Sequence, residues 1–94
     1  MRRAAKIDRG QRAMVKALRQ IPGVTVTVGM DDILVGHKGK TYWFEVKAPE
    51  AISKRTGMVK DSEITPSERE RLDNWSGHYS IVWDLNHILQ EIGV

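Results

Sequence analysis

The sequence predicts an α/β fold in which a mixed four-stranded sheet is flanked by helices. Three observations predict it: a helical hydrophobic stripe near the N-terminus, three closely spaced runs typical of strands, and a helix, a strand and a helix in the second half. The expected element order is therefore αβββαβα. The chain has 94 residues, which fits one domain spanning residues 1–94.

The first half predicts one helix and three strands. From about residue 5 to residue 20 one helical stripe carries Ile7, Gln11, Met14, Leu18 and Ile21. Pro22-Gly23 ends this helix. Residues 24–28 alternate with period two and are β-branched throughout, so they form a strand. Two further strands are expected at residues 32–35 and 41–47, joined by a hairpin turn over residues 36–40.

The second half predicts a loop followed by a helix, a strand and a helix. Residues 48–63 carry glycine and charge with little periodicity, so we expect a loop. Thr65-Pro66-Ser67-Glu68 is a capping box that begins a helix over residues 66–75, with Glu68, Leu72 and Trp75 on its inward stripe. A short strand follows at residues 79–83, and Asp84 caps a last helix that ends before Gly93. The three tryptophans, Trp43, Trp75 and Trp83, are expected in the core rather than as base-stacking platforms.

Composition excludes several classes of protein. The chain has no cysteine, so it has neither disulfides nor a thiolate nucleophile or metal ligand. No apolar run approaches the roughly 20 residues of a membrane span, and the N-terminus lacks a signal-peptide core. These features fit a cytoplasmic protein with no membrane partner.

Positive charge is unevenly distributed, although the net charge is only +3. Basic residues crowd the first 20 positions and form a second cluster around a glycine. Such clusters can neutralise phosphates, and the alternative is a solvated helix face with a basic terminus. The candidates for contact with DNA are Arg9, Arg12, Lys54, Arg55 and Lys60.

The predicted hairpin brings two acids and a lysine together. A turn centred on Lys38-Gly39 places Asp32 directly opposite Glu45, with Lys47 on the same face. Opposed like charges are unfavourable, and a hard divalent cation such as Mg²⁺ or Mn²⁺ between them would reverse that sign. The alternative is a surface hairpin end that carries an ordinary Lys–Glu pair.

These residues resemble the signature of a nuclease family. Residues 29–35, Gly-Met-Asp-Asp-Ile-Leu-Val, followed by Phe44-Glu45-Val46-Lys47, are similar to the G-x-P-D…E-x-K motif of the virus-type replication-repair nuclease (VRR-Nuc) family within the PD-(D/E)xK superfamily. Similarity continues through Ile64-Thr65-Pro66-Ser67-Glu68 and Trp75-Ser76-Gly77 into the final strand and helix, and so covers nearly the whole chain.

The resemblance implies a restriction-endonuclease-like fold and cleavage of DNA with Mg²⁺ or Mn²⁺. It also implies that small phage and bacterial members are homodimers that resolve four-way (Holliday) junctions. By the same resemblance, Asp32, Glu45 and the main-chain carbonyl of Val46 would bind the metal, and Lys47 would assist the nucleophilic water.

Three positions depart from the family pattern. Asp31 stands where the family has proline, and is either a water-mediated ligand or a turn residue. Gln11 stands where glutamate is usual, and either faces the metal site or caps a strand end. Glu68 stands where glutamine is usual, and is either an accessory residue that faces the metal site or a residue that its capping box already explains.

Three functions remain open. They are an endonuclease on branched DNA, a nuclease on flaps or duplex ends, and a nucleic-acid-binding module without chemistry. The presence of Asp32, Glu45 and Lys47 together argues against the last, because a binding module needs no opposed acids.

Overall fold

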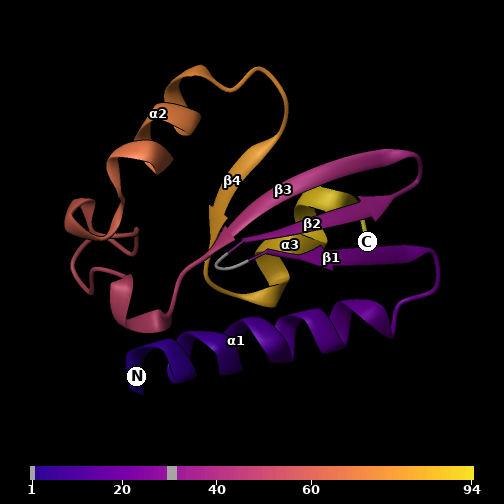
Figure 1. Ribbon diagram of the computed structural model, residues 1–94, viewed down its shortest axis with the longest axis horizontal. Helices are drawn as coiled ribbons and strands as arrows, with labels where there is room; N and C mark the ends of the chain where they lie inside the picture. The colour runs from indigo at the N-terminus through magenta and orange to yellow at the C-terminus, as the bar shows by residue number, and fades with distance from the viewer. Residues whose placement is uncertain (1, 30–31) are drawn as a thin grey trace.

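The structure, a computed structural model, describes the backbone of residues 2–29 and 32–94, and side chains from residue 10 onward within those ranges. The elements follow the expected order, with two short 3₁₀ helices added (Figure 1): α1 Arg2–Arg19, β1 Val24–Val28, β2 Asp32–His37, β3 Lys40–Val46, η1 Pro49–Ala51, η2 Asp61–Glu63, α2 Pro66–Asn74, β4 Tyr79–Val82 and α3 Leu85–Ile92. Within the described residues, no helix is long and apolar enough to cross a membrane.

The four strands form one mixed sheet in the order β1-β2-β3-β4. β1, β2 and β3 are antiparallel neighbours, whereas β4 pairs in parallel with β3. A parallel neighbour requires a crossover connection, and the segment that contains η1, η2 and α2 provides it (Figure 1). The predicted mixed sheet with flanking helices is therefore confirmed.

The turn between β2 and β3 fixes the register of the hairpin. Lys38 and Gly39 have φ angles of 53° and 78°. Two successive positive φ values are typical of a type I′ turn, whose twist matches that of paired strands. The pairs run from His37↔Lys40 to Asp32↔Glu45, which is the predicted register.

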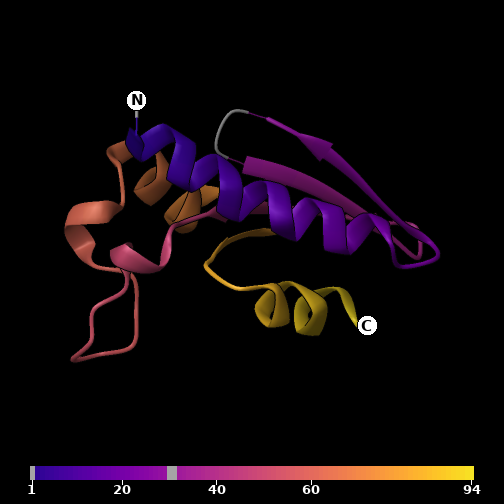
Figure 2. The same cartoon turned by 90° about the horizontal axis from the view of Figure 1, so that it is seen from below.

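The hydrophobic core lies on one face of the sheet. β2 and β3 contribute alternate residues to it, and α1 and α3 cover them; Figure 2 shows α3 beneath this face. Its buried side chains are Val15, Leu18, Val24, Ile33, Val35, Phe44, Val46, Val82, Ile88 and Ile92. Because side chains alternate along a strand, Asp32, Trp43 and Glu45 belong to the opposite face, which is turned toward the viewer in Figure 1.

Two expectations for the second half differ from the structure. Residues 48–63 hold η1, η2 and an isolated bridge between Ile52 and Val59, where only a loop was expected. The inward stripe predicted for the second helix holds only at Glu68, which is buried, because Leu72 is 39% exposed and Trp75 is 52% exposed. The expectation that Trp75 lies in the core is therefore wrong. α2 lies at the margin of the sheet (Figure 1).

Alanine at two glycines should have opposite effects on stability. Gly39→Ala forces a Cβ into left-handed backbone and should destabilise the protein by about 1–2 kcal/mol. Gly10→Ala is the matched control, because Gly10 is exposed in α1 with open space around it; it should stabilise by about 0.5–1 kcal/mol. Chemical denaturation measures both, and equal effects would contradict the type I′ turn.

Candidate active site

Asp32 and Glu45 form an opposed pair at the open end of the hairpin. The Asp32 carbonyl accepts the Gly29 N–H at 2.8 Å and the Gln11 amide at 3.2 Å. This carbonyl therefore points toward β1, and the pair with Glu45 on β3 is not hydrogen-bonded through the main chain. In such pairs the two side chains are at their closest, with Cβ atoms about 4.5–5.5 Å apart.

The Asp32 carboxylate is held on two sides. The Trp43 indole N–H donates to Oδ2 at 2.8 Å. Oδ1 lies so close to Gly29 that a Cβ at that position would collide with it. A side chain at position 29 would therefore displace this carboxylate from the orientation in which Trp43 holds it.

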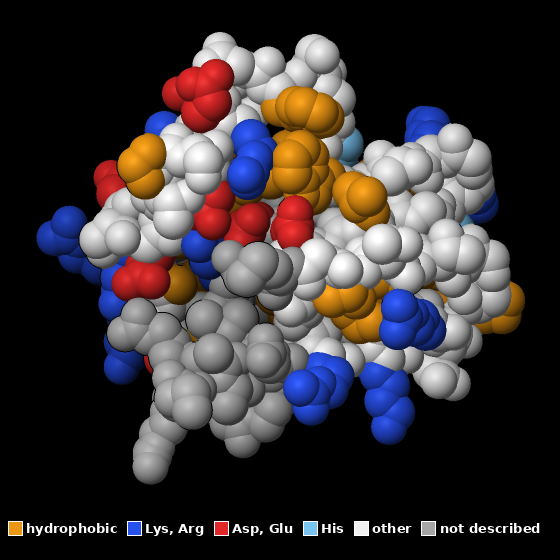
Figure 3. Space-filling model, viewed as in Figure 1, with side chains coloured by type: hydrophobic (Ala, Val, Ile, Leu, Met, Phe, Trp, Pro, Cys, Tyr) orange, Lys and Arg blue, Asp and Glu red, His pale blue; other side chains and the backbone are white. Residues whose placement is uncertain are grey.

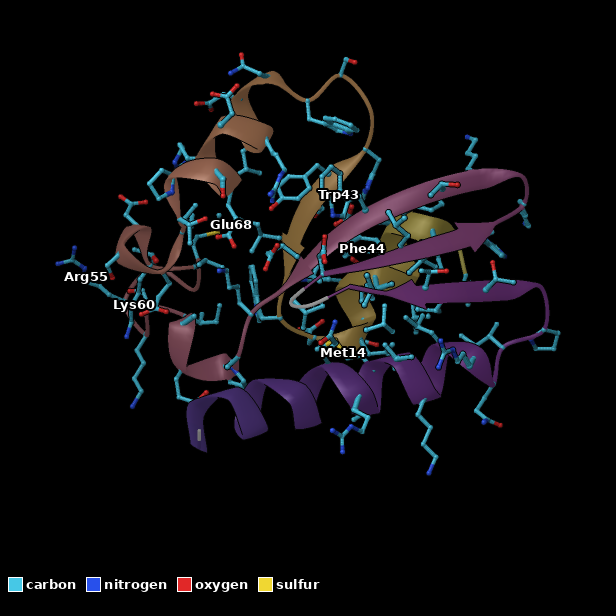
Figure 4. All side chains as sticks on the ribbon, viewed as in Figure 1. Met14, Trp43, Phe44, Arg55, Lys60 and Glu68 are labelled. Atoms are coloured by element: carbon cyan, nitrogen blue, oxygen red, sulfur yellow. The ribbon has the colours of Figure 1, made fainter. Side chains whose placement is uncertain are left out.

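Lys47 and Glu68 form a largely buried ion pair beyond Glu45 at the end of β3. Lys47 Nζ lies 2.9 Å from Glu68 Oε1 and 3.1 Å from Oε2. Only 4% of Glu45 and 4% of Glu68 is exposed. Glu68 also completes the predicted capping box, because Oε1 accepts the Thr65 N–H at 3.0 Å. One carboxylate thus both begins α2 and ties it to the end of β3 (Figure 4).

The pKa values of Glu68, Tyr79 and Arg71 are shifted by burial and by the charges around them. Burial tends to raise the pKa of Glu68, but hydrogen bonds from Lys47 and Thr65 outweigh it, so this pKa lies below its ordinary value of 4.5. Burial raises the pKa of Tyr79, and the Glu45 and Glu68 charges add to the effect. The pKa of Arg71 is raised by its hydrogen bond to Tyr79 and by the acids. The charge of Glu45 therefore acts on both Tyr79 and Arg71.

The main-chain carbonyl of Val46 is directed toward the same end of the hairpin. The N–H of the peptide between Val46 and Lys47 donates to the Val82 carbonyl of β4 at 2.9 Å. Because C=O and N–H are opposed in a trans peptide, the Val46 oxygen points away from β4 and toward the β2 side. It therefore faces the edge at which β2 begins with Asp32.

These oxygens make up the candidate donor set for a cation. Among the residues whose side chains the structure describes, no three aspartate, glutamate, histidine or cysteine side chains are grouped so that they could hold a metal ion. The set consists instead of two carboxylates and one main-chain carbonyl, all hard oxygen ligands. Figure 3 shows acidic side chains near the centre of this face, with basic and hydrophobic side chains beside them.

The accessory candidates have separate positions. Gln11 is buried and its amide caps the first residue of β2, which agrees with the strand-capping alternative. Asp31 lies outside the described residues, as does the side chain of Arg9. The remaining candidates for contact with DNA are exposed: Arg12, Lys54, Arg55 and Lys60. Arg55 and Lys60 lie on the crossover segment, farther from the sheet than Glu68 (Figure 4).

Two residues of this site were missed by the sequence analysis. Trp43 is a diagonal neighbour of Asp32 in the predicted register, within reach of a long aromatic side chain, so the hairpin pattern held the signal. Arg71 comes from α2, and its guanidinium carbon lies 5.0 Å from the centre of the Trp43 ring. No local pattern relates α2 to β3, so Arg71 had no such signal.

Comparison with known proteins identified no relative. No protein-family model matches the chain, and no curated protein or solved structure matches it.

Stability should decrease in acid through Glu68. Because its pKa is lowered in the folded protein, the carboxylate stabilises the fold fully above about pH 4.5, and this contribution is lost as pH falls through the lowered pKa. Wild type should therefore lose more thermal stability below pH 4.5 than Glu68→Gln does. Exposed Glu70 on the same helix provides the control, Glu70→Gln.

At neutral pH, Glu68→Ala should destabilise by roughly 3–5 kcal/mol, because it leaves Lys47 without its partner and removes the cap. Glu68→Gln should be milder, since glutamine also completes a capping box. Identical acid sensitivity of wild type and Glu68→Gln would refute the lowered pKa.

Proposed function

We propose that this protein is a metal-dependent DNA endonuclease of the VRR-Nuc type with a restriction-endonuclease-like core. One observation carries the proposal: Asp32 and Glu45 are opposed in a pair that Gly29, Gln11 and Trp43 hold in place. The order of three antiparallel strands, a crossover helix and a parallel fourth strand also supports it.

The donor set fits Mg²⁺ or Mn²⁺. Asp32, Glu45 and the Val46 carbonyl would hold such an ion through hard oxygens, leaving positions for water and phosphate. When bound, the ion would neutralise phosphate charge and lower the pKa of a water molecule. A cation here would also offset the repulsion between the two opposed carboxylates.

Lys47 brings a positive charge of the protein itself to the site. Its ammonium is oriented by both oxygens of Glu68 on the face that carries Glu45. In this position Lys47 would orient the attacking water or stabilise the charge that develops on the phosphate. Glu68 would act by positioning Lys47, beside its role in capping α2.

Branched DNA is the proposed substrate, bound by a homodimer in the cytoplasm of a bacterial or phage-infected cell. The exposed cations Arg12, Lys54, Arg55 and Lys60, with Arg9, would contact backbone phosphates. The second candidate is a nuclease on flaps or duplex ends. It is favoured by Trp75, which is 52% exposed and contacts the Trp43 ring bound to Asp32, because an exposed ring can stack on a base that is not covered by a neighbour. A binding module without chemistry does not require the Asp32–Glu45 pair.

Cleavage should require a hard divalent ion and Asp32. Labelled four-way, flap and linear DNA should be cut with Mn²⁺ and left intact in EDTA. Asp32→Asn should abolish cleavage, because it removes one ligand charge, yet keep DNA binding intact or slightly tighter. Asp73→Asn, which makes the same charge change at an exposed position on α2, should cut normally. Wild-type cleavage in excess EDTA would reject the metal mechanism.

The protein should sediment as a homodimer at micromolar concentration. A small domain without disulfides gains stability from burying apolar surface against a copy of itself. A two-fold dimer also presents two equivalent sites to a four-way junction, so paired, symmetric nicks are expected. Affinity should fall steeply as salt rises. A protein that stays monomeric with and without junction DNA, yet nicks flaps, would favour the second candidate.

A further inference from the structure

We propose that an aromatic cluster beside the acids is a stacking site for an unpaired DNA base. The cluster consists of Trp43, Trp75, Tyr79 and Arg71. The proposal deepens the proposed nuclease function, on which it rests, by naming the feature of the DNA that is recognised next to the scissile phosphate.

The three rings form one connected surface. Trp43 and Trp75 meet edge to face with centroids 5.0 Å apart, and Trp43 meets Tyr79 in the same way at 5.0 Å. Trp43 is fixed in the sheet, because its main-chain N–H donates to His78 Nδ1 at 3.1 Å and its indole N–H donates to Asp32. The cluster is thus rigid where it joins the acids.

Trp75 leaves the cluster open to solvent. It directly follows α2, and 52% of it is exposed although it is held against Trp43. Gly77 lies under its indole nitrogen, so that a Cβ there would come within 3.0 Å of Nε1. A half-exposed tryptophan that packs against another ring offers apolar ring surface, and base stacking on such a surface contributes in any sequence context.

Arg71 gives the cluster its charge complementarity to DNA. Its guanidinium carbon lies 5.0 Å from the centre of the Trp43 ring and 5.5 Å from that of Tyr79. Of its five N–H donors, one contacts the Tyr79 hydroxyl, at the long distance of 3.4 Å. A cation stacked on aromatic rings, with donors that can turn toward an anion, suits a nucleotide, which has a planar base and a phosphate.

The aromatic cluster lies directly beside the proposed catalytic acids. Trp43 contacts both Asp32 and Trp75, so the width of one indole separates a base on Trp75 from the acid pair. Within duplex DNA both faces of a base are covered by its neighbours, so an unpaired base can stack on Trp75 whereas an interior paired base cannot. The cluster therefore favours DNA that has unpaired nucleotides beside the scissile phosphate, as in a flap, over fully paired DNA. An apolar peptide segment bound to the cluster instead of DNA would bring no phosphate to Asp32 and Glu45.

Binding in EDTA, where chemistry is absent, tests the stacking site alone. Three labelled duplexes of equal length would be compared by fluorescence anisotropy: fully paired, with three unpaired thymines, and with three abasic residues at the same positions. The abasic duplex keeps the unpaired backbone and its charge but lacks the bases. Wild type should bind the thymine duplex on the order of 10-fold more tightly than the abasic duplex.

Variants assign this preference to the indole. Trp75→Ala should bind the thymine and abasic duplexes equally, whereas Trp75→Phe should keep most of the preference because it keeps a ring. Leu72→Ala is the matched control, since Leu72 is an exposed apolar residue of α2 without a ring; it should behave as wild type. Equal binding of thymine and abasic duplexes by wild type would overturn the proposal without need of any variant.

Cleavage of the same duplexes with Mn²⁺ separates the two proposals. If none is cut but thymine is preferred over abasic DNA, the nuclease proposal fails and the stacking site stands. If DNA is cut while wild type shows no preference for bases, the stacking site fails and the nuclease proposal stands.

Discussion

The register of the β2–β3 hairpin is the constraint on which the rest of the molecule depends. Lys38 and Gly39 make a two-residue turn with positive φ at both positions, and this turn decides which residues face each other. A slip of one residue would move every side chain of a strand to the opposite face. It would expose Ile33 and Phe44 and separate Asp32 from Glu45. Burial of the core and assembly of the acids are therefore one structural requirement.

Burying the acids opposes stability, and the surrounding contacts offset part of that effect. Buried ion pairs gain little after desolvation, so the link between Lys47 and Glu68 is best understood as a specificity device that holds α2 at one edge of the sheet. Glu68 has two roles, because the same carboxylate also accepts the Thr65 N–H at the start of the helix. Such concentrations of buried charge are typical of sites where chemistry outweighs stability.

Local pattern predicted what is decided locally. The hairpin, the capping box and the Asp84 cap each follow from a few neighbouring residues, and the structure has all three. The position of α2 depends on a long crossover. The helical stripe in the sequence therefore could not reveal that Leu72 and Trp75 are partly exposed to solvent. The metal, the DNA and the dimer remain predictions, because they depend on partners rather than on the chain's own packing.

The bridge between Ile52 and Val59 makes part of the crossover a replaceable module. Its two ends are held together, so residues between them could be added, removed or exchanged with little effect on the path from β3 to β4, since loop-closure entropy grows slowly with length. Lys54 and Arg55 lie within this module, whereas Asp32, Glu45 and Lys47 lie outside it. Substitutions at the proposed DNA contacts Lys54 and Arg55 are therefore structurally independent of the proposed catalytic residues.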